Sequence, residues 1–313
     1  MSARSSSSPG SAPSDPITLY YTDEATGAER TMPYTTTLVH YALLPNGTAV
    51  CTYCTPKNLN ALTPAQMWDT WAILAHCYRD DRVRCLVWTG EGRAFGAGAA
   101  LGARAGAPTT IPKHVQTSMK ACGFGPDGTM VLRALTLAHW DLPKPSIVAV
   151  NGLAVGGHAN IALVNFHDLV VCSTEARFKY PFAQLGFTPE LGSSMMMPQI
   201  VGPARAKEIM FLGDWFSAQD AKEMGLVNRV VAPEELMPTV LQMADRLCAQ
   251  HPAALRRAKE ILNRAQREQL DRNMEQEQVV FMKSMNETGG PPGVKKWRER
   301  EMAERKQRAT SKL

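Results

Sequence analysis

The segment SIVAVNGLAVGGH, residues 146–158, carries the strongest structural signal in this chain. Residues 146–151 form a short apolar run of the kind that predicts a buried strand. The pair Gly156-Gly157 predicts a turn, because glycine adopts backbone conformations that other residues avoid. A helix is then expected from about His158 to Asn165. The segment therefore predicts a strand, a turn and a helix in succession, the unit of which α/β folds with parallel sheets are built.

A second segment of the same kind, VRCLVWTGEGRAFGAGAAL, covers residues 83–101. A buried strand is expected over Val83–Thr89, and the small residues after it let a backbone approach a ligand closely. Two such turns can each aim one backbone N–H at a single oxygen, an arrangement that stabilises an oxyanion. Glycine-rich turns also serve as plain connections. Neither segment matches the phosphate-binding patterns GxxxxGK[ST] or GxGxxG.

The rest of the chain continues the alternation of strands and helices. The turn Pro45-Asn46-Gly47 predicts a hairpin within residues 35–54, and Thr63-Pro64-Ala65-Gln66 predicts a helix start. Further strands are expected over 169–173 and 227–231, and a further helix over 130–140. From Pro233 onward the pattern is helical, and Leu236, Val240, Ala244 and Leu247 share one face.

These elements predict an α/β fold with a parallel sheet. We predict four parts: a flexible N-terminal extension over 1–34, a core over 35–232, a helical region over 233–300 and a tail over 301–313. Residues 107–128 are interrupted by proline and glycine and predict a loop or insertion.

Composition narrows the classes of function. The chain has 313 residues, 44% of them hydrophobic, which is enough for one sizeable core. Its 34 basic and 29 acidic residues give a net charge of +5, with mixed signs near the C-terminus, so we predict no nucleic-acid partner. We also predict no membrane span and no metal site, because no apolar run is long enough and no Cys/His cluster has ligand spacing. The seven cysteines show no paired framework, which is typical of a reducing compartment.

The sequence ends in Ser311-Lys312-Leu313. Serine-lysine-leucine at an extreme C-terminus is a peroxisomal address read by a receptor. Residues 1–15 are rich in serine, proline and glycine and lack the apolar segment of a secretory signal. We therefore predict a matrix protein of the peroxisome or a peroxisome-like organelle, with the peroxisomal import receptor as a partner.

Several ordered motifs together resemble the enoyl-CoA hydratase/isomerase (crotonase) superfamily, over roughly residues 36–300. The motifs are Asn60-Ala61-Leu62, residues 83–90, Arg93-Ala94-Phe95, Ala97-Gly98-Ala99, Lys144-Pro145, residues 149–152, Gly156-Gly157, Asp168-Leu169 and residues 213–231. The resemblance implies a ββα-spiral core and a helical C-terminal region that forms a homotrimer or a dimer of trimers. It also implies acyl-CoA thioester substrates, with coenzyme A as part of the substrate and no separate cofactor.

The resemblance assigns roles to individual residues. The N–H groups of Ala99 and Gly157 would form an oxyanion hole for the thioester oxygen. Lys57 and Ala61 match positions at which relatives approach the nucleotide portion of coenzyme A. The substrate-binding residues implied in this way are Lys57, Ala61, Ala97, Gly98, Gly156, Phe182 and Phe187.

Two departures separate the chain from the hydratases of the superfamily. Those enzymes use two glutamates, and the matching positions here hold Asn160 and Phe182, neither of which is a useful acid or base. The run PFAQLGFTPELGSS, residues 181–194, instead resembles the signature of peroxisomal-type Δ3,Δ2-enoyl-CoA isomerases. In that subfamily the glutamate after the proline is the catalytic base, and this position is Glu190.

The resemblance thus implies an isomerase that moves a C3–C4 double bond to C2–C3 in fatty acyl-CoA thioesters, a step in the β-oxidation of unsaturated fatty acids and so in lipid metabolism. One carboxylate can take a proton from C2 and return it at C4. An acyl pocket lined by Phe182 and Phe187 would raise the pKa of Glu190 by desolvation. The alternatives are a dienoyl-CoA isomerase, a hydratase, a thioester hydrolase or a non-catalytic acyl-CoA-binding protein. The motifs do not specify a preference for acyl chain length or double-bond geometry.

Overall fold

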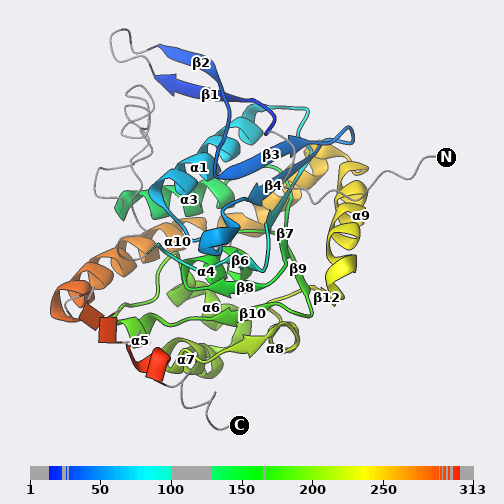
Figure 1. Cartoon of the computed structure of the whole chain (residues 1–313). Helices are drawn as coiled ribbons and strands as arrows, with labels where there is room; N and C mark the ends of the chain where they lie inside the picture. Colours follow the sequence, from blue (N-terminus) through cyan, green and yellow to red (C-terminus); the bar gives the residue numbers. More distant parts are fainter. Residues whose placement is uncertain are drawn as a thin grey trace.

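A six-stranded sheet forms the centre of the molecule (Figure 1). The computed structural model describes residues 14–22, 26, 28–100, 129–164, 166–288, 290, 292–293, 295–296 and 299–303. The sheet order is β12-β9-β7-β5-β4-β3; β3 and β4 are antiparallel, and the other neighbours pair in parallel. The bounds are β3 Val39–Leu43, β4 Thr48–Tyr53, β5 Cys85–Gly90, β7 Ser146–Val150, β9 Leu169–Ser173 and β12 Arg229–Val231.

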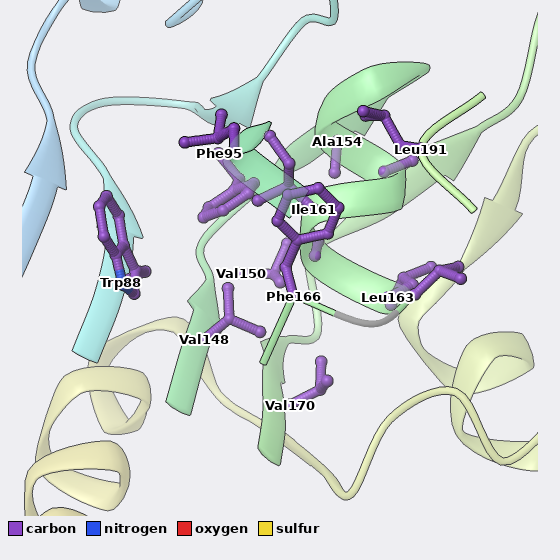
Figure 2. Close-up of a cluster of buried hydrophobic side chains, with 14 of the residues drawn as sticks. Trp88, Phe95, Val148, Val150, Ala154, Ile161, Leu163, Phe166, Val170 and Leu191 are labelled. Atoms are coloured by element: carbon purple, nitrogen blue, oxygen red, sulfur yellow. The ribbon is translucent and has the colours of Figure 1, made fainter. Parts of the chain in front are cut away.

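Both faces of this sheet are covered, which explains why its strands read as continuous apolar runs. On β7, Val148 and Val150 face the main core, whereas Ile147 and Ala149 face the second core beneath α9 (Leu236–Cys248). This alternation follows from the period of two in a strand. Figure 2 shows the main-core side, where Val148 and Val150 lie below the helix that carries Ile161 and Leu163.

A smaller sheet of short strands lies beside the first, in the order β11-β10-β8-β6. The chain passes from a long strand to a short strand and then to a helix, as in β7-β8-α4 and β9-β10-α5. This repeated passage is the ββα spiral, so the predicted fold class is confirmed. The bounds are β6 Ala94–Gly96, β8 Leu153–Val155, β10 Arg177–Lys179, β11 Phe216–Ser217, α4 Gly157–Leu163, α5 Phe182–Leu185, α6 Ser193–Val201, α7 Pro203–Leu212 and α8 Ala218–Glu223.

Two local predictions in the first half of the chain, a hairpin and a helix start, are confirmed. The hairpin β3–β4 closes at the predicted turn, and α1 (Pro64–Arg79) begins where expected. Thr63 caps α1 by accepting the N–H of Gln66 at 3.2 Å. The reciprocal half of a capping box is not formed, because the Gln66 side chain is buried with no hydrogen-bond partner among the described residues. The short helix η1 (Pro56–Asn58) precedes α1, and α3 (Thr129–Trp140) follows β6 in the described chain.

The N-terminal prediction was wrong for residues 17–22 and 29–34. These residues form the antiparallel strands β1 (Ile17–Thr22) and β2 (Glu29–Tyr34), rather than part of a flexible extension. Ile17 and Leu19 are buried in the main core, and β1 packs on α1. The alternation of buried Ile17 and Leu19 with half-buried Thr18 and Tyr20 is too short to distinguish a strand from an extended tail in the sequence alone.

The helical C-terminal part does not form a separate unit. After η3 (Pro233–Glu235), α9 packs against the six-stranded sheet, with Leu236, Val240 and Ala244 buried as predicted from their spacing. The long helix α10 (Pro252–Thr288) then crosses the molecule (Figure 1). No helix among the described residues is long and apolar enough to cross a membrane. The predicted insertion at 107–128 and the tail that ends in Ser311-Lys312-Leu313 lie outside the described residues.

Candidate active site

The two glycine-rich turns identified from the sequence meet in the structure. Gly98 has a positive φ of 80°, and a β-carbon placed on it would lie only 2.8 Å from the carbonyl oxygen of Val155. This added β-carbon would also lie 3.9 Å from the α-carbon of Gly156. Glycine at position 98 is therefore needed both for its backbone conformation and for the close approach of the two turns.

Each turn has a backbone N–H that donates no hydrogen bond to a described residue. Leu62 forms a parallel bridge with Ala99: the Leu62 N–H donates to Gly98 O at 2.8 Å, and the Ala100 N–H donates to Leu62 O at 2.9 Å. The N–H of Ala99 points away from this bridge, and no acceptor for it is recorded among the described residues. Gly157 is the first residue of α4, where an N–H has no acceptor within the helix.

His158 holds the Gly98 turn in place. Its Nδ1 accepts the N–H of Gly98 at 3.2 Å, and its ring packs directly on Gly96. The ring also meets those of Tyr53 and Phe95 edge to face. Burial lowers the pKa of His158 to about 3, so the ring is neutral near pH 7 and can accept this hydrogen bond. His158 thus supports the site structurally, and its neutral, buried ring is not placed to act as an acid near pH 7.

The structure brings Glu190 to the Gly157 turn. A β-carbon placed on Gly157 would lie 3.3 Å from Glu190 Oε1, so the carboxylate lies directly over this backbone position. Burial, and to a smaller extent the negative charge of Glu277, raises the pKa of Glu190 to about 7. A carboxyl group with this pKa can accept and release a proton near neutral pH. The direction agrees with the prediction, although the contribution of Glu277 was not foreseen.

Asn160 fixes the backbone of the Glu190 loop. Its Nδ2 donates to the carbonyl oxygen of Glu190 at 2.9 Å, and Ser193 Oγ donates to the same oxygen at 2.7 Å. Sequence reasoning identified Asn160 as the position of a hydratase glutamate but did not predict this hydrogen bond. In this chain the position thus holds the loop that carries a different carboxylate.

The loop has an unusual backbone conformation that tertiary contacts maintain. Leu191 has a φ of 60° and Gly192 a φ of 78°, both in the left-handed region. Such a conformation is costly for leucine and persists only where the surroundings enforce it. The Leu191 side chain is buried beside α4 (Figure 2), and the Gly192 N–H donates to Glu277 Oε2 at 2.7 Å. The strained turn directs the preceding residue, Glu190, towards Gly157.

The remaining predicted substrate-binding residues lie on several elements. Ala97 belongs to the segment that pairs with residues 59–62, since its N–H donates to Leu59 O at 2.9 Å. Lys57 is exposed on η1, and Ala61 is half-buried in the same segment. The segment that carries Lys57 and Ala61 is therefore brought next to the Ala99 turn.

The two aromatic residues predicted to line an acyl pocket are packed differently from one another. Phe182 is buried in the main core at the start of α5. Phe187 is half-buried and packs against Phe281 of α10, with ring centroids 5.3 Å apart. A cavity of about 540 Å³ beside α10 and one of about 310 Å³ beside α7 include neither residue, nor Glu190.

The chemistry available at the site is that of one carboxylate and backbone N–H groups. In the described part of the chain, no group of three or more His, Cys, Asp or Glu side chains is arranged to hold a metal ion. A half-buried carboxylate with a raised pKa beside Gly157 can move a proton at carbon, and backbone N–H groups on the same turns can stabilise negative charge on an oxygen.

Known proteins resemble this chain in sequence and in structure. Residues 44–308 match the family described as enoyl-CoA hydratase/isomerase. A crotonyl-CoA hydratase of Syntrophomonas wolfei is 33% identical over 227 residues, which cover 72% of this chain and 82% of the relative. A 1,2-epoxyphenylacetyl-CoA isomerase of Escherichia coli is 34% identical over 231 residues, which cover 74% of this chain and 84% of the relative.

Among solved structures, an enoyl-CoA hydratase/isomerase from Pseudoalteromonas atlantica superposes with a TM-score of 0.72 at 25% identity, covering 84% of this chain and 98% of that protein. An enoyl-CoA hydratase from Mycobacterium avium subsp. paratuberculosis superposes with a TM-score of 0.68 at 23% identity, covering 83% and 96%. The family match spans most of the chain, and the fold agrees with it. The chain therefore belongs to the enoyl-CoA hydratase/isomerase (crotonase) superfamily.

Proposed function

We propose that this protein is a Δ3,Δ2-enoyl-CoA isomerase with Glu190 as its base. The observation that carries the proposal is the position of the Glu190 carboxylate over Gly157, with a pKa raised to about 7. The two hydratase positions hold Asn160 and Phe182, and the Asn160 amide is already bonded to the Glu190 backbone. Glu190 is thus the carboxylate best placed for proton transfer at this turn.

The proposed reaction moves one proton. Glu190 takes a proton from C2 of the 3-enoyl thioester, and the electron pair spreads over the conjugated system to the thioester oxygen. The N–H groups of Ala99 and Gly157 stabilise that oxygen, and one such donor typically contributes about 3 kcal/mol to the transition state. Glu190 then returns its proton to C4, the thioester carbonyl re-forms, and the double bond lies between C2 and C3. No electron leaves the substrate, so we propose no cofactor beyond the coenzyme A of the substrate.

Hydration of a 2-enoyl-CoA is the second candidate, because several similar proteins are named hydratases. Water addition needs a group that activates water at C3 and a group that protonates C2. Glu190 alone would have to serve both steps, since neither Asn160 nor Phe182 can replace a carboxylate. We therefore rank hydration below isomerisation.

The decisive experiment compares two reactions of the purified protein. A coupled assay follows the conversion of a 3-enoyl-CoA, and a parallel assay follows the hydration of a 2-enoyl-CoA. We expect rapid isomerisation and negligible hydration, with isomerisation lost in the Glu190→Gln variant. Hydration that exceeds isomerisation would favour the second candidate. Tight acyl-CoA binding without either reaction would favour a non-catalytic acyl-CoA-binding protein.

Three further properties belong to this proposal. Lys57 and Ala61, on the segment paired with the Ala99 turn, are proposed to contact the nucleotide portion of coenzyme A. The Lys57→Ala variant should then raise KM more than it lowers kcat.

The assembly is proposed to be a homotrimer or a dimer of trimers, which light scattering can test. The terminal Ser311-Lys312-Leu313 supports import into the peroxisome or a related organelle. Deleting these three residues from a fluorescent fusion should then leave the protein outside the organelle.

A further inference from the structure

Glu277 of α10 reaches the loop that carries Glu190. Glu277 is only 8% exposed. Both of its carboxylate oxygens accept hydrogen bonds from backbone N–H groups at the start of α6. Oε2 accepts the N–H of Gly192 at 2.7 Å, and Oε1 accepts the N–H of Ser194 at 2.9 Å. The bonded Gly192 is two residues from Glu190. Glu277 thus caps α6 and fixes the strained turn at the same time.

The position of Glu277 is itself well supported. Asn273, one turn earlier on α10, donates to Glu277 Oε1 at 3.1 Å and to Ser194 Oγ at 2.9 Å. The helix is held near its start, where Lys259 Nζ bonds Asp168 Oδ2 at 2.8 Å. The same helix is also held at Asp271, whose Oδ1 forms an ion pair with Arg133 Nη2 of α3 at 2.6 Å. Glu277 is therefore a fixed carboxylate on a fixed helix.

The charged groups around Glu190 come from few elements. From α10, Glu277 acts on Glu190 through its negative charge. The α4 side contributes the neutral Asn160 amide and the buried neutral His158, and the α6 side contributes Ser193. Among the described residues, the groups that shift the pKa of Glu190 do not include a cation. The charge of Glu277 thus disfavours a second negative charge on Glu190 and favours its protonated form.

We propose that Glu277 is a positioning residue for the reaction: it holds the 190–192 turn through Gly192 and Ser194, and it places a carboxylate against the backbone two residues from Glu190. The inference rests on the proposed function, because it assigns a task to Glu277 only if Glu190 moves the proton. The arrangement joins the C-terminal helix to the catalytic turn. It therefore makes activity depend on how α10 docks, although no group of α10 touches the reacting atoms.

The first test is the pH profile of kcat and kcat/KM for isomerisation. Glu190 must be ionised to accept a proton, so activity should rise with pH through its pKa. In Glu277→Gln the negative charge is lost, and the midpoint should move to lower pH by about half a unit or more. Glu277→Asp keeps the charge but shortens the reach, so the midpoint should stay near that of the wild type while kcat falls several-fold. Glu268→Gln removes an exposed carboxylate that pairs with Arg272 on the same helix and should change neither quantity.

The outcomes separate a positioning residue from a merely structural one. A loss of kcat at all pH values with an unmoved midpoint in Glu277→Gln would overturn the electrostatic part of the proposal. An unchanged kcat in Glu277→Asp would overturn the positioning part. Circular dichroism of each variant establishes that it is folded. If Glu277→Gln does not fold, the Glu277→Asp result still decides the positioning part.

A second test does not depend on activity and so separates this inference from the proposed function. Thermal unfolding of wild type, Glu190→Gln, Glu277→Gln and the double variant forms a cycle. At pH 8 the gain in Tm from Glu190→Gln should be smaller in the Glu277→Gln background, because one cause of repulsion has already been removed. At pH 5 most of this non-additivity should disappear, since Glu190 is then protonated in the folded state. Additive effects at both pH values would refute the coupling, whereas coupling without isomerase activity would leave the coupling intact and refute the isomerase function.

Discussion

Replacing Glu190 with glutamine keeps the size of the side chain and removes its ability to ionise. In the folded protein the pKa of this carboxyl is raised from 4.5 to about 7. The difference of about 2.5 pH units corresponds to roughly 3 kcal/mol, at about 1.36 kcal/mol per unit. Because the residue keeps some contact with solvent, we expect a value of about 2 kcal/mol in practice.

The sign of the effect depends on pH. Below pH 4.5 the carboxyl is protonated in both states, so Glu190 costs nothing. As the pH rises from 4.5 to 7, the unfolded chain ionises first, and stability is progressively lost. Above pH 7 the full cost is present, and Glu190→Gln removes it. The variant should therefore be more stable than the wild type at pH 8, while the proposed isomerase activity should fall by about 10²- to 10⁴-fold.

Thermal unfolding followed by circular dichroism measures this effect. At pH 8 we expect Tm of Glu190→Gln to exceed that of the wild type by about 4–8 °C. At pH 5 the difference should shrink to about a quarter of that value. Glu208→Gln, at an exposed position on α7, is the matched control and should show no such pH dependence. An equal Tm difference at both pH values would refute the argument that Glu190 is destabilised by ionisation.

Three further predictions concern Gly157, Asn160 and two buried histidines. Gly157→Ala places a β-carbon 3.3 Å from Glu190 Oε1, so the variant should fold normally but lose at least about tenfold in kcat/KM; wild-type activity would contradict the proposed geometry. Asn160→Ala removes the hydrogen bond to Glu190 O and should cost about 1 kcal/mol in urea unfolding, with a lower kcat. Burial lowers the pKa of His139 to about 4 and that of His158 to about 3, so the unfolded chain binds protons first as the pH falls below 6.5. Tm should therefore fall between pH 6.5 and pH 4.5, and His158→Gln should weaken that dependence.

Local pattern was sufficient wherever neighbouring residues decide the conformation. The apolar runs at 146–150 and 169–173 are strands, and their continuous apolar character fits a parallel sheet that is covered on both faces. The turn at Gly47 and the cap at Thr63 could be predicted from the sequence because they depend on residues within three positions. The position of Glu190 in the chain could be singled out, since its motif resembles that of a known subfamily.

Tertiary structure decided what depends on residues far apart in the chain. The hairpin of β1 and β2 is stable because Ile17 and Leu19 dock on elements formed later in the sequence, and the short segment itself does not show which elements those are. The same holds for the site. Glu190 faces Gly157 because Asn160 and Glu277, which lie 30 residues before the loop and 85 residues after Gly192, hold its backbone. The sequence names the carboxylate, but its pKa follows from burial and from a charge on α10, and both exist only once the chain has folded.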